Sequence, residues 1–208
     1  MSIERFTVVD GVAAPMPIAN VDTDVIVRVD RLAKLPRADL GRFAFEALRY
    51  RGDGGEDPGF VLNRPPYREA RILVAGENFG CGSSREMAVW AIAGLGIRVV
   101  IAPSFGEIFF ANCFQNGLLP VTLPAQTVAR MAERLEADPA TARMTVDLER
   151  CEIRTGWGET IPFAVEALRR RMLLEGADEI ALTLAREAEI AAFQTRDRER
   201  RPWIYVKS

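Results

Sequence analysis

Residues 71–86 read RILVAGENFGCGSSRE, an apolar run followed at once by a glycine-rich segment. The run at 71–75 predicts a buried β-strand. The glycines from Gly76 to Gly82 predict a loop, because glycine permits turns and close backbone approach, and this loop opens a predicted helix over about 84–93. The stretch therefore predicts a strand, a loop and a helix in direct succession.

The residues that follow repeat this pattern. A second apolar strand is predicted at 97–102, a helix at about 105–114 and a third strand at 118–123. Strands and helices in alternation, with continuously apolar strands, are typical of a parallel sheet covered by helices. We therefore expect an α/β fold with a mostly parallel central sheet.

The rest of the chain is predicted to complete one domain over residues 1–208, with a C-terminal helical extension at about 163–200. The arginine-rich end of that extension, 196–201, is expected to be a solvated tail. The other expected elements are a short β-like stretch at 6–9, a helix at 40–48, a surface loop at 51–66, a helix at 127–135, a strand pair at 144–148 and 152–154, and helices over 163–192 with a break near Gly176.

Composition excludes several classes of function. The chain is 49% apolar and 27% charged, as in ordinary globular proteins, and its net charge of −2 gives no sign of nucleic-acid binding. The first residues show no apolar core of a signal peptide, and no apolar run reaches the roughly 20 residues of a membrane span. We therefore expect a cytoplasmic protein that binds neither nucleic acid nor membrane.

The chain contains no histidine and has three cysteines, Cys81, Cys113 and Cys151. Without imidazole there is no serine–histidine–aspartate triad and no histidine metal ligand. The wide cysteine spacing fits neither a zinc site nor an iron–sulfur site, so we expect no metal held by this chain alone. Catalysis would then depend on other side chains or on a partner.

The segment around Ser83 permits two interpretations. Ser83 and Glu86 have the spacing of a capping box, which would simply stabilise the start of a helix. Alternatively, free amides and the positive end of the helix dipole form an anion site, to which Arg85 adds a guanidinium suited to a carboxylate. The glycine order matches neither a dinucleotide-binding fingerprint nor a P-loop, so nucleotide binding is a weak alternative.

Residues 22–24 read Asp-Thr-Asp and are open to two interpretations as well. They suit a turn with side-chain capping, or they form hydrogen bonds with the serine loop. Beyond them lies a basic stretch that contains Arg28 and Arg31 and is interrupted by Leu32. It is either a solvated loop or a loop that contacts substrate.

Several motifs resemble the bacterial isopropylmalate dehydratase small subunits of the aconitase superfamily. They are NVDTD at 20–24, GENFGCGSSRE at 76–86, and APSF at 102–105 together with NGLLP at 116–120, with IALTL at 180–184 near the end. They occur in order over nearly the whole chain. The resemblance implies a swivelling β/β/α domain that closes an active site borne by a larger subunit.

The resemblance also implies roles for particular residues. Ser83 would be the base that removes the proton α to a carboxylate, while Ser84 and Arg85 would hold the substrate carboxylate and Asp24 would support them. Substrate contacts would come from Gly82 and from Arg28, Arg31 and Leu32. A [4Fe–4S] cluster would sit on the large subunit, this chain would bind no cofactor, and the substrate would be a small di- or tricarboxylate.

Several positions depart from the family pattern. Met87 and Arg171 stand where histidines are usual, and Arg28 and Arg31 lie in a stretch that differs from the usual one. Arginines at 28 and 31 would favour a polar group on the substrate. Three functions therefore remain open: the isopropylmalate enzyme of leucine biosynthesis, a related hydratase for a citraconate-, methylmalate-, dimethylmaleate- or aconitate-like acid, and a non-catalytic scaffold. Self-association of the isolated chain is a further open alternative.

Overall fold

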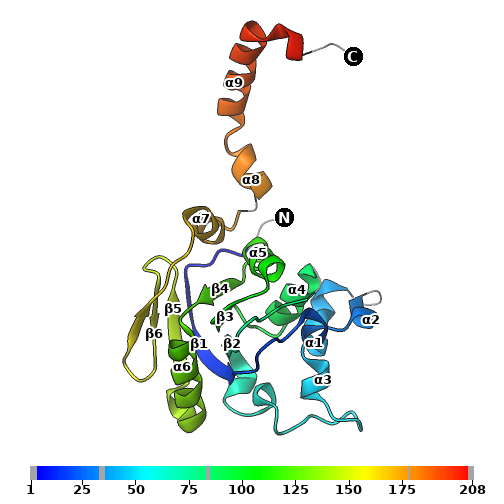
Figure 1. The fold of residues 1–208 in the computed structure, drawn as a ribbon, viewed down its shortest axis with the longest axis vertical. Coiled ribbons are helices and arrows are strands. Elements are labelled where there is room, and N and C mark those ends of the chain that lie inside the picture. The colour runs from blue at the N-terminus through cyan, green and yellow to red at the C-terminus, as the bar shows by residue number, and fades with distance from the viewer. Residues whose placement is uncertain (1–3, 33–35, 83–84, 178, 206–208) are drawn as a thin grey trace.

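The fold is built around a seven-stranded sheet in the order β4-β3-β2-β1-β5-β6-β7 (Figure 1). The structure is a computed structural model, and it describes residues 4–32, 36–82, 85–177 and 179–205. The strands are β1 Val8–Met16, β2 Ala70–Ala75, β3 Val99–Ala102, β4 Leu119–Thr122, β5 Arg143–Asp147, β6 Glu152–Arg154 and β7 Thr160–Pro162. The α-helices are α1 Thr23–Ile26, α2 Val29–Leu32, α3 Glu46–Arg49, α4 Glu86–Gly94, α5 Glu107–Gln115, α6 Ala125–Ala137, α7 Ala167–Glu175, α8 Glu179–Leu184 and α9 Glu187–Arg200. The 3₁₀ helices are η1 Arg37–Phe43, η2 Val61–Asn63, η3 Tyr67–Glu69, η4 Pro139–Thr141 and η5 Pro202–Ile204.

Strands β1 to β4 form the parallel half of the sheet, which confirms the α/β prediction. Strands β2 and β3 are apolar and buried almost throughout, as expected when helices cover both faces. Strands β5, β6 and β7 extend the sheet in antiparallel fashion from β1.

The central strand β1 differs from the sequence-based prediction of a short stretch at 6–9. It spans nine residues and pairs with β2 on one side and β5 on the other. The sequence signal is weak because Gly11 and Pro15 are depleted in strands. Burial against two neighbouring strands compensates for that low propensity, since Ala13 and Ala14 are completely buried.

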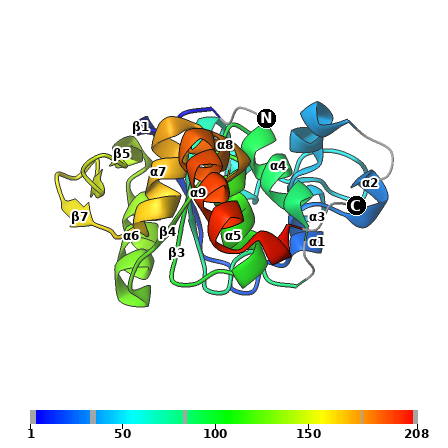
Figure 2. The ribbon, with the colours of Figure 1, turned by 90° about the horizontal axis from the view of Figure 1, so that it is seen from above.

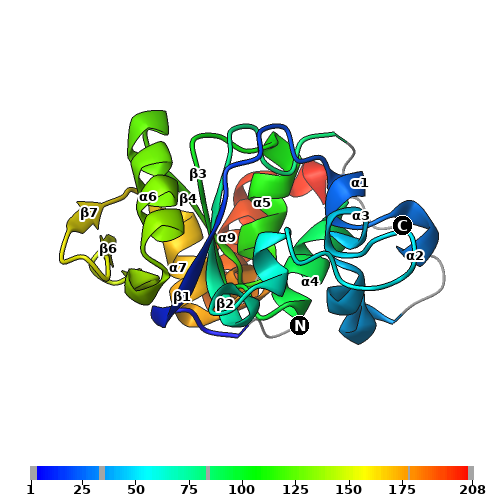
Figure 3. The same cartoon turned by 90° about the horizontal axis from the view of Figure 1, so that it is seen from below.

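Helices cover both faces of the parallel half. Helices α4 and α5 lie on one face and α6 on the other (Figures 2 and 3). Helix α6 buries Val128, Met131, Ala132 and Leu135, whose spacing forms one apolar stripe. The carboxyl ends of the parallel strands stay open for the loops described below.

The helix predicted at 40–48 is instead two short elements, η1 and α3. Phe45 separates them with a left-handed φ of 55° and a completely buried ring. A Cβ on Gly41 of η1 would lie 2.3 Å from the backbone of Gly94 in α4. Close packing of these two backbones thus replaces the regular helix that the apolar pattern predicts.

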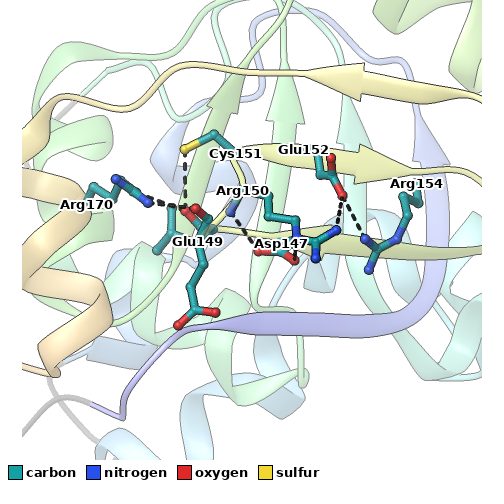
Figure 4. Close-up of polar contacts among 8 residues, drawn as sticks. Asp147, Glu149, Arg150, Cys151, Glu152, Arg154 and Arg170 are labelled. Atoms are coloured by element: carbon teal, nitrogen blue, oxygen red, sulfur yellow. Dashed lines mark hydrogen bonds and ion pairs between the residues drawn. The ribbon is translucent and has the colours of Figure 1, made fainter.

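The last part of the chain leaves the body of the molecule after α7. Helix α7 packs on α5, and Arg170 donates from Nε to the Leu148 carbonyl (3.0 Å) and from its terminal nitrogen to the Glu149 carbonyl (2.7 Å), which fixes the β5–β6 turn (Figure 4). Beyond Gly176, helices α8 and α9 project away from the sheet (Figure 1). The predicted solvated tail at 196–201 is largely the exposed end of α9.

Candidate functional site

Two loops that follow neighbouring parallel strands lie side by side at the carboxyl edge of the sheet. The loop after β2 donates a backbone hydrogen bond from Gly80 to the Val21 carbonyl (2.7 Å). The loop after β1 returns one from Thr23 to the Cys81 carbonyl (3.0 Å). These bonds continue the β1–β2 pairing beyond the regular strands. The carboxyl edge of a parallel sheet is where α/β proteins bind ligands.

The loop after β3 joins the same arrangement. The Asn78 backbone amide donates to the Ser104 hydroxyl (2.8 Å), and the Phe79 amide donates to the Ser104 carbonyl (3.1 Å). The Gly106 amide donates to the Phe79 carbonyl (2.9 Å). Three consecutive parallel strands therefore contribute interlocked loops to one place.

Gly80 shows why glycine is needed in this loop. Its φ is +71°, and a Cβ would lie 2.2 Å from the Phe109 ring. That ring packs edge-on against the buried Phe79, with centroids 5.5 Å apart. The glycine-rich loop is therefore seated directly on the aromatic part of the core, which fixes its path.

The three residues of the Asp-Thr-Asp motif have different structural roles. The Asp22 carboxylate caps α1 by accepting a hydrogen bond from the Val25 amide (2.8 Å). Thr23 holds the β2 loop through its backbone, as above. Asp24 forms an ion pair with Arg85. The first residue of the motif thus has a capping role, and the last contacts Arg85, which follows the two serines in sequence.

The ion pair between Asp24 and Arg85 joins two predicted site residues that are 61 positions apart. The Arg85 side chain is only 16% exposed, whereas that of Asp24 is 56% exposed. The hydrogen bond from Arg85 lowers the pKa of the Asp24 carboxyl. A guanidinium has five N–H donors, and among the described residues the Arg85 guanidinium has Asp24 as its one hydrogen-bond partner.

The start of α4 differs from the capping-box interpretation. Arg85 is the N-cap residue and its side chain makes no capping bond, so Glu86 is the first helical residue instead of the third. Glu86 accepts a hydrogen bond from Asn116. Ser83 and Ser84 lie outside the described residues. The predicted site residue Gly82 precedes them with φ +89°, and a Cβ there would lie 3.5 Å from the Asp22 Cβ.

The predicted substrate-contacting residues lie in and around α2. Arg28 pairs with Asp30 (3.1 Å), and Arg31 forms two hydrogen bonds with Glu46 (2.6 and 3.0 Å). Leu32 is the last residue of α2. Since both guanidiniums already have carboxylate partners, they give no support for the selection of a polar substrate group.

Glu46 is a residue that the sequence analysis missed. It lies in α3, fifteen positions from Arg31, and the Arg31 guanidinium also stacks over the Phe43 ring at 4.6 Å. No local pattern connects these residues. Only the turn between η1 and α3 brings them together.

Met87 and Arg171, which stand where histidines are usual in the family, have ordinary surroundings. Met87 packs against the core, and Arg171 points outward to pair with Glu175 (2.7 Å), one turn along α7.

In the described part of the chain, no three cysteine or acidic side chains are grouped as metal ligands. Cys113 is completely buried, and this burial raises the pKa of its thiol. None of the helices described is long and apolar enough to cross a membrane, and the cytoplasmic location stays a prediction.

Comparison with known proteins first gives the class. A model of the aconitase C-terminal domain matches residues 3–126, which contain the interlocked loops. A model described as LeuD_N matches residues 129–167, and a model of the C-terminal domain of 3-isopropylmalate dehydratase small subunits matches 179–205. The protein is thus built on an aconitase-type domain.

Individual relatives narrow this class. The 3-isopropylmalate dehydratase small subunits of Ruegeria pomeroyi and Parvibaculum lavamentivorans are each 50% identical over 97% of this chain and 100% of their own length. The crystal structure of 3-isopropylmalate dehydratase (leuD) from Methanocaldococcus jannaschii matches with a TM-score of 0.64 and 28% identity, over 89% of this chain and 99% of that one. The chain belongs to the family of 3-isopropylmalate dehydratase small subunits, which confirms the resemblance seen in its motifs.

Proposed function

We propose that this chain is the small subunit of a heteromeric hydro-lyase that interconverts 2-isopropylmalate and 3-isopropylmalate in leucine biosynthesis. Water is eliminated to give an unsaturated diacid and is added back on the neighbouring carbon. Family membership supports this reaction. The observation that carries the proposal is the Asp24–Arg85 ion pair, which brings both predicted halves of the site together at the carboxyl edge of the sheet.

In this proposal Arg85 binds the substrate carboxylate. Its guanidinium is largely buried and is oriented by Asp24, so its remaining N–H groups are held in place before substrate arrives. Ser84, the adjacent residue in the sequence, is proposed to add donors to the same carboxylate. As negative charge develops on the carboxylate during proton removal, these donors stabilise it.

Ser83 is proposed as the base that removes the α-proton. A serine hydroxyl is a weak base, but a positive helix end and a nearby guanidinium both favour its ionised form. Gly82 allows the backbone to approach the substrate closely. The proton passes to the Ser83 oxygen and returns from it to the other carbon on rehydration.

The substrate's isopropyl group is proposed to contact the loop that contains Arg28, Arg31 and Leu32. With the arginines neutralised by Asp30 and Glu46, an apolar group can approach this loop without leaving a charge unpaired. Val29, in the same helix, is about half exposed and offers an apolar contact.

The partner is proposed to be a large subunit that carries a [4Fe–4S] cluster. The cysteines of this chain do not suit such a cluster, because Cys113 is buried inside α5 while Cys81 and Cys151 lie in separate loops. When bound to the partner, the cluster would supply Lewis-acid chemistry at the substrate hydroxyl. This chain would close the site over the substrate.

The experiment co-expresses this chain with its large subunit under anaerobic conditions and measures hydration of isopropylmaleate, citraconate, dimethylmaleate and cis-aconitate by ultraviolet absorbance. We expect isopropylmaleate to be preferred and Ser83→Ala to abolish turnover. Arg85→Gln should raise KM and lower kcat. The matched control is Arg68→Gln, which breaks a similar ion pair, with Glu56, away from the site and should keep activity.

Preference for another diacid would replace the proposed substrate. A fully active Ser83→Ala enzyme would contradict the proposed base. No turnover by an assembled complex with an intact cluster would favour the scaffold alternative.

A further inference from the structure

The Asn116 side chain uses all of its hydrogen-bonding capacity at the C-terminus of α5. Its amide oxygen accepts from the Trp90 indole (2.7 Å) and from an Arg37 terminal nitrogen (3.2 Å). Its amide nitrogen donates to a Glu86 carboxylate oxygen (2.9 Å) and to the Asn112 carbonyl (2.9 Å). Two donors and two acceptors are the full complement of an asparagine amide.

The partners also fix the orientation of this amide. Indole and guanidinium groups only donate, while the carboxylate and the carbonyl only accept. A flipped amide would therefore lose all four bonds. Asn116 can hold its partners in only one arrangement.

Two of these partners directly adjoin or follow the two segments proposed to act on substrate. Glu86 is the first residue of α4 and directly follows Arg85. Arg37 is the first residue of η1 and follows the loop from Arg28 to Leu35. Arg37 also stacks over the Trp90 ring at 4.6 Å.

The packing between η1 and α4 supports the same connection. Gly41 and Gly94 let the two backbones approach so closely that neither accepts a Cβ without displacement. Helix α4 therefore follows Arg85 at its start and packs against η1, the element that follows the proposed substrate loop.

We propose that Asn116 is a positioning residue that couples the catalytic segment at Ser83–Arg85 to the substrate loop at Arg28–Leu35. The inference rests on the proposed function of those segments and adds a residue that touches neither substrate nor cluster. Asn116 holds the first turn of α4 through Glu86 and the start of η1 through Arg37. The start of α4 and the start of η1 are thereby held at one spacing.

The test is made in the complete enzyme with its large subunit. Asn116→Asp keeps the acceptors for Trp90 and Arg37 but places a carboxylate against Glu86. Displacement of the first turn of α4 is expected to lower kcat by roughly 10- to 100-fold, as small misplacements of reacting groups do. Glu86→Gln alone should stay within about twofold of wild type, because its amide oxygen still accepts from Asn116.

The double variant Asn116→Asp/Glu86→Gln restores the bond with donor and acceptor exchanged. We expect it to recover most of the kcat lost per folded complex, a quantity that a loss of stability alone would not have lowered. Glu86→Ala removes the acceptor of the same hydrogen bond and should lower kcat. The coupling can therefore be tested even if Asn116→Asp folds poorly. Arg37→Met should raise KM several-fold with little change in kcat.

Asn63→Asp is the matched control. Asn63 is buried, and its amide nitrogen donates to the Arg49 and Asp57 carbonyls (2.7 and 2.8 Å). Asn63→Asp removes these two hydrogen bonds, so it should reduce stability but leave kcat per folded complex unchanged. The coupling is overturned if Asn116→Asp keeps wild-type kcat, if the double variant does not recover, or if both aspartate variants lose equal activity. An active Ser83→Ala enzyme would instead overturn the underlying site.

Discussion

The interlocked loops at the carboxyl edge of the sheet and the C-terminal arm, residues 179–205, are held in opposite ways. The loops are fixed by hydrogen bonds between segments far apart in sequence and by a buried aromatic base. The arm is ordered by its own helical bonds and by local contacts, such as those of Asp197 with Arg201 (2.7 Å) and Tyr205 (2.9 Å). Phe193 and Trp203 on the arm are more than half exposed. The difference shows that a precise site depends on non-local burial, whereas the arm is ordered by contacts close together in sequence.

Substitution at Gly80 is expected to have the largest effect on the loop side of this comparison. Gly80→Ala adds a Cβ against the Phe109 ring at a positive φ, and should reduce the free energy of unfolding by about 3 kcal/mol. Urea denaturation of the wild-type and variant chains measures this difference in the free energy of unfolding. Gly54→Ala is the control, because Gly54 has a φ of +81° but open space around it, so only the backbone cost of about 1–2 kcal/mol applies. Equal losses would mean that the ring contact is unimportant.

The junction between body and arm can be tested at two adjacent arginines. Arg170→Met removes two hydrogen bonds to the β5–β6 turn and should cost about 1–2 kcal/mol. Arg171→Met removes only an exposed pair with Glu175 and should cost less than about 0.5 kcal/mol. Thermal denaturation distinguishes them. A larger loss at Arg171 would contradict this assignment of α7 to the body.

The Asp24–Arg85 pair should make a small, pH-dependent contribution to the free energy of unfolding. Because the folded pKa of Asp24 is lowered, its contribution is present above the unfolded pKa of about 4 and disappears as the pH falls through the folded pKa. Since Asp24 is largely exposed, we expect less than about 1 kcal/mol. The difference in unfolding free energy between wild type and Asp24→Asn, measured from pH 7 to pH 2, should shrink with acidification. A difference that grows on acidification would reverse the sign.

Removal of the arm should have the smallest effect on stability. A chain ending at Ala177 keeps the C-cap of α7, in which the Ala177 amide donates to the Met172 carbonyl. We expect its thermal midpoint to stay within about 3 °C of the full chain, because less than about 1 kcal/mol should be lost. A much larger decrease would show that the arm is part of the folding unit.

Much of the α/β core was predictable because its signals are local. The apolar runs of β2, β3 and β4 and the glycine stops between them fall close to their predicted places. The prediction failed where tertiary contacts overrode propensity. Strand β1 contains glycine and proline yet forms the centre of the sheet, and the apolar pattern at 40–48 gives way to the close approach of Gly41 to Gly94.

The candidate site divides in the same way. Its residue types and motifs, including Asp24 and Arg85, stand out in the sequence because their chemistry and spacing are unusual. The partners Glu46 and Asn116 do not, because a carboxylate or an amide acquires such a role only from neighbours brought together by folding.

The sequence by itself determined the family, the order of the core elements and the chemical groups available for catalysis, since these depend on local pattern and residue type. Only the tertiary structure decided that Asp24 neutralises Arg85, that Arg31 is already paired and that Asn116 joins two distant segments. Hydrogen bonds and ion pairs depend on distance in space, and distance in space between remote residues is set by the packing of the whole sheet and its helices.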